Sequence, residues 1–231
     1  MNRIFFRTIP RSLNWLAAFS LTVLLLKVFL LNKISEPIAG MSELGVIVEG
    51  ILGSVIASYV FYLIVVHLKE LADKRVIYPH VTKWACRVVG DCNSQLSAVS
   101  IQIEAPLDFH HLEKNHVEAA FKKIDPQSNA PLIFSPNNYA NWPQYFLHYK
   151  SRSQRYIYKI MSQLIFLDAK LVAHLTRIDD CSHFNFLEMV AHQPASINDM
   201  NIFAGTFFEY CIACRELDSY LLGHAAYADM A

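Results

Sequence analysis

The sequence predicts an all-α protein, in which an N-terminal two-helix transmembrane hairpin precedes a cytosolic α-helical domain. Two apolar runs, near residues 13–31 and 44–66, are each long enough to cross the roughly 30 Å hydrocarbon core of a bilayer as a helix. The rest of the chain repeats its apolar residues at helical spacing. The whole chain of 231 residues has seven glycines and nine prolines, which disfavours a turn-rich β protein.

Composition predicts the domain organisation. Hydrophobic residues make up 54% of the chain, the mean hydropathy is positive and the formal net charge is zero. The chain is too apolar for an ordinary soluble domain and too polar for a polytopic transporter. We expect a basic N-terminus at residues 1–11, the hairpin at 12–67 and the helical domain at 68–231. Because the first run is too long for a typical signal peptide and no clear cleavage site follows, we expect an uncleaved anchor.

Positive charge predicts the orientation of the hairpin. Basic residues flank both of its outer ends, whereas the turn between the spans carries little positive charge. They are Arg3, Arg7, Arg11, Lys69, Lys74, Arg75, Lys83 and Arg87. By the positive-inside rule both termini are cytoplasmic, and the cluster after the second span is best explained as a topology determinant and a contact with lipid headgroups.

Two charged residues lie inside the spans. Lys27 is four residues from the outer end of the first span, and Glu49 is five residues into the second. At about 1.5 Å of rise per residue the two lie at a similar depth. Ionisable residues in a membrane pair with each other or line a water-filled path. Lys27 and Glu49 therefore either form an ion pair that fastens the hairpin or line a pore once several hairpins assemble, and a Lys27 that extends to the interface is a further possibility.

The second span also carries a ladder of small residues. The ladder residues lie four apart in two rows: Gly50, Ser54 and Ser58, and beside them Gly53 and Ala57. Small residues at this spacing share one face of a helix and allow a partner helix to approach closely. The ladder therefore predicts helix packing, including packing between copies of the chain.

The remaining chain is expected to be helical, with one long loop. Apolar spacing and capping residues predict helices at residues 76–103, 108–124, 141–178, 182–192 and from 198 or 199 onward. The first of these helices is entered past Pro79. Asp108 and Asn141 cap the next two helices. Residues 125–141, with three prolines, form the loop. Buried seams are expected at Ile157, Met161, Leu164, Leu171, Leu175 and Ile178, and at Phe203, Phe207, Tyr210, Cys214, Leu217 and Leu221.

Metal-binding and catalytic signatures are missing from the sequence. Cys211-x-x-Cys214 lacks the second cysteine pair that a zinc site needs, so we expect these cysteines to be small buried core residues, and no HExxH is found. The chain has no GxSxG, GxxxxGK[ST] or GxGxxG. Asp168 is expected to be buried and to pair with a residue such as Arg215. We therefore predict no catalytic residue, no metal, no cofactor and no enzymatic activity.

A basic segment is the main candidate for contact with a partner. Residues 126–167 contain no Asp or Glu, and tyrosines alternate there with the cations Lys150, Arg152, Arg155 and Lys159. Such a segment binds nucleic acid through phosphates and stacked bases, or is an ordinary solvated helix face. A third possibility is contact with residues 168–231, where Asp and Glu outnumber Lys and Arg by nine to three.

The second span and the charged segment after it carry a resemblance. The run GSVIASYVFYLIVV at residues 53–66, followed by charged residues 69–75, resembles the two-transmembrane effector of a bacterial retron anti-phage system. The resemblance implies an inner-membrane toxin without catalytic residues, held inactive by a reverse transcriptase and its multicopy single-stranded DNA (msDNA). On release such an effector permeabilises the membrane, as a homo-oligomer within the lipid bilayer, and the infected cell dies by abortive infection.

Two other classes remain open. The chain is alternatively a membrane-tethered helical binding or scaffold protein without pore activity, for which the hairpin is only an anchor. A membrane-bound hydrolase or nuclease is the third class, and it needs a cluster of buried carboxylates that the sequence does not indicate.

Overall fold

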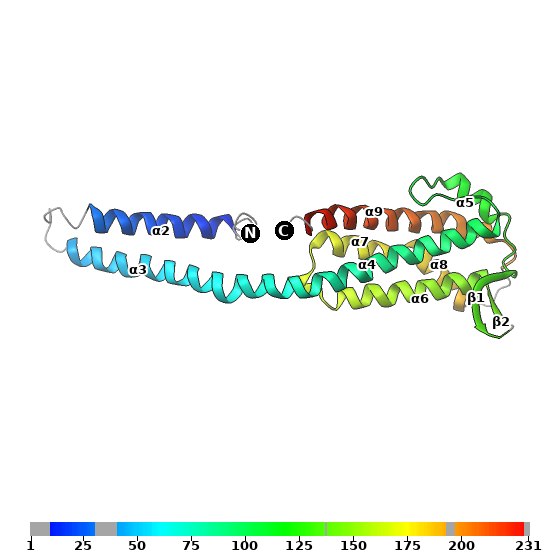
Figure 1. Ribbon diagram of the computed structural model, residues 1–231, viewed down its shortest axis with the longest axis horizontal. Coiled ribbons are helices and arrows are strands. Elements are labelled where there is room, and N and C mark those ends of the chain that lie inside the picture. Colours follow the sequence, from blue (N-terminus) through cyan, green and yellow to red (C-terminus); the bar gives the residue numbers. More distant parts are fainter. Residues whose placement is uncertain (1–9, 31–40, 137, 193–196, 229–231) are drawn as a thin grey trace. The chain divides into compact units, whose positions relative to one another are not determined.

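The computed structural model describes residues 10–30, 41–136, 138–192 and 197–228. The described chain is mostly helical and contains a two-stranded sheet (Figure 1). It divides into two compact units, residues 1–76 and residues 77–230. Most of the predicted basic N-terminus and most of the turn between the predicted spans lie outside the described residues.

The first unit consists of two apolar helices side by side (Figure 1). Helix α2 covers Arg11–Phe29 and helix α3 covers Met41–Phe61, followed by a π-helical turn, η2, at Tyr62–His67. By length and composition, α2 and the helical run that begins at Glu43 are each able to cross a membrane. Most of their large apolar side chains are exposed, so the hairpin does not form a core of its own.

Helix α4, Leu68–Gln102, follows η2 directly and contains Pro79. The expectation that this helix starts near residue 76 and is entered past Pro79 was wrong. A proline inside a helix removes one backbone hydrogen bond and costs about 3 kcal/mol. Packing beyond it offsets this cost, because Val81 and Ala85 are fully buried in the core of the second unit.

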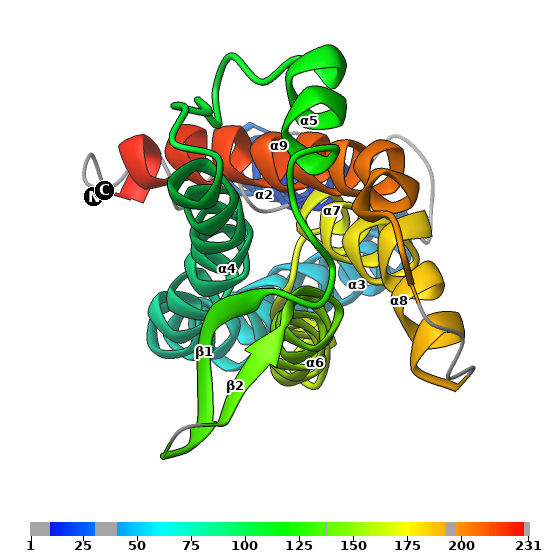
Figure 2. The same cartoon turned by 90° about the vertical axis from the view of Figure 1, so that its right-hand side faces the viewer.

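The second unit is a helical bundle that carries a small β-hairpin. After α4 its elements are α5 (Lys114–Phe121), β1 (Asn129–Ser135), β2 (Asn138–Asn141), α6 (Trp142–Met161), η3 (Leu164–Phe166), α7 (Ala169–Asp179), α8 (Ser182–His192), η4 (Met200–Phe203) and α9 (Ala204–Ala228). Figure 2 shows α4 and α6 nearly end on and α9 running across the view, with α5 against α9. The helices of this bundle hold in place the side chains of the second unit that are discussed below.

Helix α9 provides the centre of this core. All six residues of its predicted seam are buried, which confirms the seam: Phe203, Phe207, Tyr210, Cys214, Leu217 and Leu221. The ring of Phe207 lies 5.2 Å from that of Phe121 and 5.4 Å from that of Phe146, centroid to centroid. Aromatic contacts therefore join α5, α6 and α9.

The predicted loop at residues 125–141 is instead an antiparallel β-hairpin. Ile133 pairs with Tyr139, and Asn129 pairs with Asn141. Ala130 is buried and Leu132 is half-buried, so alternate residues of β1 face the bundle. Pro131 is tolerated because a two-stranded sheet has edge positions that need no N–H donor. The prolines and asparagines suggested a loop, and the short β-forming run that they flank was overlooked.

The predicted long helix at residues 141–178 is two helices. Asn141 caps α6 as expected, in a capping box with Gln144. Helix α6 ends at Met161, however, and α7 starts only after Asp168, whose side chain accepts hydrogen bonds from the N–H groups of Lys170 and Leu171. The seam spacing continues across the break, so the apolar pattern did not reveal it. Leu164, which was expected in the seam, is exposed.

Two other local expectations were wrong. Asp108 does not begin a helix, since α5 starts at Lys114 after Glu113, and the Asp108 carboxylate instead contacts the backbone N–H of His110 and the ring of His111. Asp168 does not pair with Arg215. It accepts a hydrogen bond from the hydroxyl of Tyr220, whereas Arg215 donates to the carbonyl of His110 at 2.7 Å.

A buried histidine makes the bundle sensitive to acid. His183 is fully buried, its Nδ1 lies 3.3 Å from the hydroxyl of Thr206, and burial lowers its pKa from 6.5 to about 3. Between these values the unfolded chain takes up a proton that the folded chain does not. Stability therefore falls as the pH drops below 6.5, and this histidine alone costs about 2 kcal/mol at pH 5.

Thermal unfolding of the full chain in detergent at pH 7 and pH 5 checks this prediction. His183→Leu is expected to unfold with a smaller loss of stability between the two pH values than the wild type. His148→Gln, a change at an exposed histidine, is expected to keep the wild-type loss. An unchanged pH dependence in His183→Leu would contradict the assignment.

Candidate functional site

An ion pair joins the two apolar helices of the first unit. The ammonium of Lys27, on α2, lies 2.6 Å from a carboxylate oxygen of Glu49, on α3. It also donates to the backbone carbonyl of Gly45 at 2.5 Å. The Lys27 side chain is 18% exposed and the Glu49 side chain is 45% exposed. The lysine is therefore largely enclosed by the hairpin, while part of the carboxylate remains accessible.

Gly45 was not recognised from the sequence, although it shapes this site. A Cβ atom at position 45 would lie 3.3 Å from Cε and 3.4 Å from Nζ of Lys27. The missing side chain thus allows the ammonium to reach the carbonyl. Gly45 lies one helical turn before Glu49, so the spacing of four residues was the available signal.

A second polar contact fastens the hairpin elsewhere along α2. The hydroxyl of Tyr59, on α3, donates to the side-chain oxygen of Asn14, on α2, at 2.5 Å. Beside it, Ser54 and Ser58 line a groove together with residues of α2 such as Leu16. The polar residues that interrupt the first apolar run, Asn14 and Lys27, thus both have a polar partner on α3.

Most of the small-residue ladder is not covered by α2. Gly50, Ser54, Ala57 and Ser58 are exposed, and Gly53 is half-buried. A Cβ atom at Gly50 or Gly53 would meet no heavy atom within 4 Å. These glycines are therefore not needed for the contact between α2 and α3, and the ladder leaves room for another helix.

The four cations of the basic segment lie in different environments. Lys150 is 6% exposed and forms an ion pair with Glu188, 2.9 Å away. This contact lowers the pKa of the Glu188 carboxyl below its ordinary value. Arg155 and Lys159 are exposed, one turn apart on α6. The predicted contact with nucleic acid or a partner therefore depends on these last two.

Arg152, the fourth cation, binds a buried carboxylate. Its guanidinium donates to both oxygens of Asp91 on α4, and the hydroxyl of Ser153 donates to the same carboxylate at 3.2 Å. Asp91 raises the pKa of Arg152 further above its ordinary value. The guanidinium also lies over the ring of Tyr149, 4.4 Å from its centroid. Arg152 thus connects α6 to α4 within the bundle.

Three of the five cysteines pack in the core, whereas Cys86 is exposed and Cys181 is half-buried. Cys92, Cys211 and Cys214 are buried, as expected of Cys211 and Cys214, and the sulfur atoms of Cys92 and Cys211 lie 3.6 Å apart. Burial raises the pKa of Cys92 well above its ordinary value, which keeps this thiol protonated. In the described ranges no three His, Cys, Asp or Glu residues are grouped so as to hold a metal ion.

Comparisons of the chain with models of protein families, with curated proteins and with solved structures give no match. The arrangement of the residues themselves is therefore the basis for the function proposed below.

Proposed function

We propose that this protein is a membrane effector, whose hairpin crosses the bacterial inner membrane with both termini in the cytoplasm and permeabilises it when a cytosolic inhibitor is released. The observation that carries the proposal is the Lys27–Glu49 ion pair between two otherwise apolar helices. A simple anchor has no need of charges in the bilayer, because each unpaired charge costs about 3 kcal/mol at mid-span by insertion scales.

Self-assembly of the hairpin supports the same proposal. The exposed part of the ladder, at Gly50, Ser54, Ala57 and Ser58, gives a second copy of the chain a face for close helix packing. The partly exposed carboxylate of Glu49 lies four residues before Gly53, in the same helical row as Gly53 and Ala57 of α3. Assembly along this face therefore brings the carboxylates of several copies near one another, where they would line a path for water and ions.

The inhibitor is proposed to act on the helical unit. The resemblance to retron effectors suggests a reverse transcriptase bound to its msDNA as the inhibitor, and abortive infection as the result of release. Arg155 and Lys159 are the exposed cations of the basic segment and are suited to contact phosphates of such a complex. Neither residue is paired with an acid in the bundle among the ion pairs of the described residues.

A membrane-tethered scaffold without pore activity is the second candidate. The observation in its favour is the β-hairpin, where Ile133, Phe134 and Tyr139 expose 60%, 54% and 47% of their surface. Exposed aromatic and aliphatic residues grouped on one element are typical of surfaces that bind proteins. In this case the hairpin of the first unit is an anchor only, and any other two-span anchor would replace it.

An exchange of the hairpin separates the two candidates. Bacteria are induced to produce either the full chain alone or a chain in which residues 12–67 are replaced by an unrelated two-span anchor. We expect the full chain to admit a membrane-impermeant dye and to depolarise the cells, and the exchanged chain, at equal amount in the membrane fraction, to do neither. Equal dye entry with both chains, or with neither, would contradict the effector proposal.

A further inference from the structure

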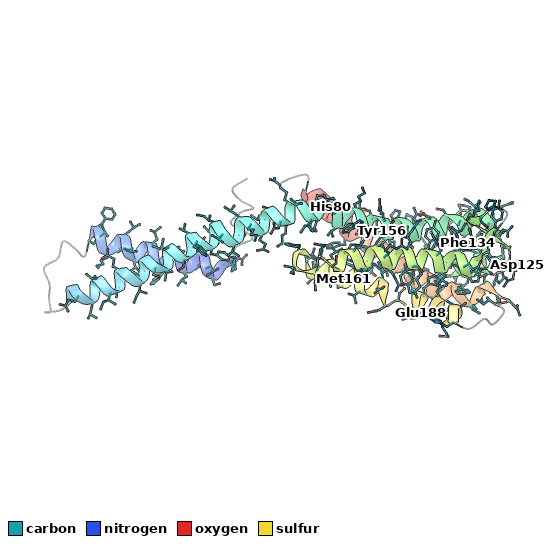
Figure 3. All side chains as sticks on the ribbon, turned by 90° about the horizontal axis from the view of Figure 1, so that it is seen from below. His80, Asp125, Phe134, Tyr156, Met161 and Glu188 are labelled. Carbon is teal, nitrogen blue, oxygen red and sulfur yellow. The ribbon has the colours of Figure 1, made fainter. Side chains whose placement is uncertain are left out.

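Three elements meet at one end of the second unit, where the chain enters it. Tyr78, on the part of α4 that begins this unit, lies near Tyr220 on α9. Tyr220 in turn donates to Asp168, the N-cap of α7. Figure 3 shows His80 and Met161 toward this end of the unit and Phe134 and Asp125 at the opposite end. The turn between α6 and α7 therefore lies at the end where the chain arrives from the first unit.

Large apolar side chains are exposed at this end. Ile165, in the turn η3, is 89% exposed, the highest value among the exposed large apolar residues of the described chain. Its neighbour Leu164 is 56% exposed, and Tyr158, on the last turns of α6, is 78% exposed. Leu222, two residues after Tyr220, is 63% exposed. A bundle that buries the predicted seam of α9 completely thus leaves an apolar tip here.

The residues around this tip are typical of a membrane interface. Lys159 and Lys170, on either side of the turn, are both exposed. A tyrosine, aliphatic side chains and flanking lysines are the composition by which proteins rest in the headgroup region, with the aliphatic groups in the acyl boundary and the cations near anionic headgroups. The exposed apolar group on the β-hairpin differs because residues 126–149 contain no Lys or Arg.

Only a short stretch of chain separates the second apolar run from the second unit. The turn η2 ends at His67, and the second unit begins at Ile77. The nine helical residues between them cover only about 14 Å. Within them lie Lys69, Lys74 and Arg75, which are suited to the same headgroup region.

We propose that Leu164 and Ile165, with Tyr158 beside them, form a lipid contact through which the helical unit rests on the surface of the bilayer. This inference depends on the proposed function, since it requires the apolar hairpin to lie in the membrane. The occupant of the tip is the lipid, because the tip combines cations with aliphatic groups and the chain length keeps it near the span.

Photocrosslinking in proteoliposomes tests this contact. The full chain carries the photoreactive residue p-benzoylphenylalanine in place of Ile165, Ile133 or Ile47, one position per preparation, in vesicles of phosphatidylethanolamine and phosphatidylglycerol. Ile133 is the matched control, since it is an exposed isoleucine at the opposite end of the same unit. Ile47, an exposed isoleucine of α3, reports whether the hairpin is in the bilayer. We expect lipid adducts at positions 47 and 165, with a yield at 165 several times that at 133.

The outcomes separate the inference from the function on which it depends. Adducts at position 47 without adducts at 165, equal yields at 165 and 133, or protein adducts at 165 in place of lipid, would overturn the lipid contact and leave the hairpin in the membrane. The absence of lipid adducts at position 47 would overturn the membrane location itself, and the lipid contact with it.

Discussion

Glu49→Gln is expected to reduce permeabilisation about tenfold at equal amounts of membrane-inserted protein. The change leaves the charge of Lys27 unpaired, while the amide at position 49 keeps an acceptor oxygen. A lysine at mid-span costs about 3 kcal/mol, and its position nearer the end of the span lowers this to the order of 1–2 kcal/mol. A tenfold effect corresponds to about 1.4 kcal/mol. Initial rates of dye entry in induced cells, normalised to the membrane fraction, measure it.

An exchange of the two charges is the matched control for this variant. Lys27→Glu combined with Glu49→Lys keeps an ion pair between α2 and α3 with its direction reversed. We expect the double variant to recover only in part, because it restores the pair but places a cation at position 49, while each single change remains impaired. Single variants that behave like the wild type would show that neither charge matters. A double variant no better than the singles would show that the site needs more than the pair.

Asp91→Ala is expected to destabilise the helical unit by about 3 kcal/mol. Asp91 is 4% exposed and accepts hydrogen bonds from Arg152 and Ser153. Removal of one partner of a buried ion pair leaves the other uncompensated and costs about 3–5 kcal/mol, and the lower end applies because the Arg152 side chain is 37% exposed. For a unit of this size the midpoint of thermal unfolding falls by about 10 °C. Circular dichroism of the full chain in mild detergent measures the shift.

Glu216→Ala is the control for this measurement. Glu216, on α9, also forms an ion pair between helices, with Arg177 on α7, but both side chains are largely exposed. Solvent screening limits such a pair to about 1 kcal/mol or less. Similar shifts for Asp91→Ala and Glu216→Ala would contradict the structural role assigned to the buried pair.

The features of the apolar hairpin were the most predictable from sequence. The two helices were predicted at residues 13–31 and 44–66, because the length and hydropathy of such apolar runs are enough to identify them. The depths of Lys27 and Glu49 suggested their contact, since helical rise is uniform. Gly45 was not recognised because its spacing of four residues from Glu49 shows only that the two share a helix face, whereas the approach of Lys27 to its carbonyl appears only in three dimensions.

The helical unit was predictable in outline and less so in its interruptions. The buried seam of α9 was predicted from the spacing of its apolar residues alone. The break between α6 and α7 was hidden because Leu164 and Leu171 continue the same seven-residue spacing on both sides of it, although Asp168 is a residue type that caps helices well. The β-hairpin was missed because the prolines and asparagines around it indicated a loop, although its strands pair with near neighbours in the sequence.

The basic segment shows where charge patterns are ambiguous. Lys150, Arg152, Arg155 and Lys159 look alike in sequence, yet the first two are bound to Glu188 and Asp91. Their partners lie 38 and 61 residues away along the chain, so no local sequence pattern shows which cations form ion pairs within the fold. The sequence left open nucleic acid, solvent or the acidic residues 168–231 as their contacts, and Lys150 does contact an acid of that range, Glu188.

Leakage from liposomes tests the central claim most directly. Purified full-length protein is inserted into vesicles that hold a self-quenched dye, with no other protein present, and is compared with Gly50→Leu. This change adds bulk to the exposed ladder without a clash inside the hairpin, because nothing lies within 4 Å of a Cβ atom there. We predict rapid dye release by the wild type and little release by equally inserted Gly50→Leu. Intact vesicles with fully inserted wild-type protein would contradict the account.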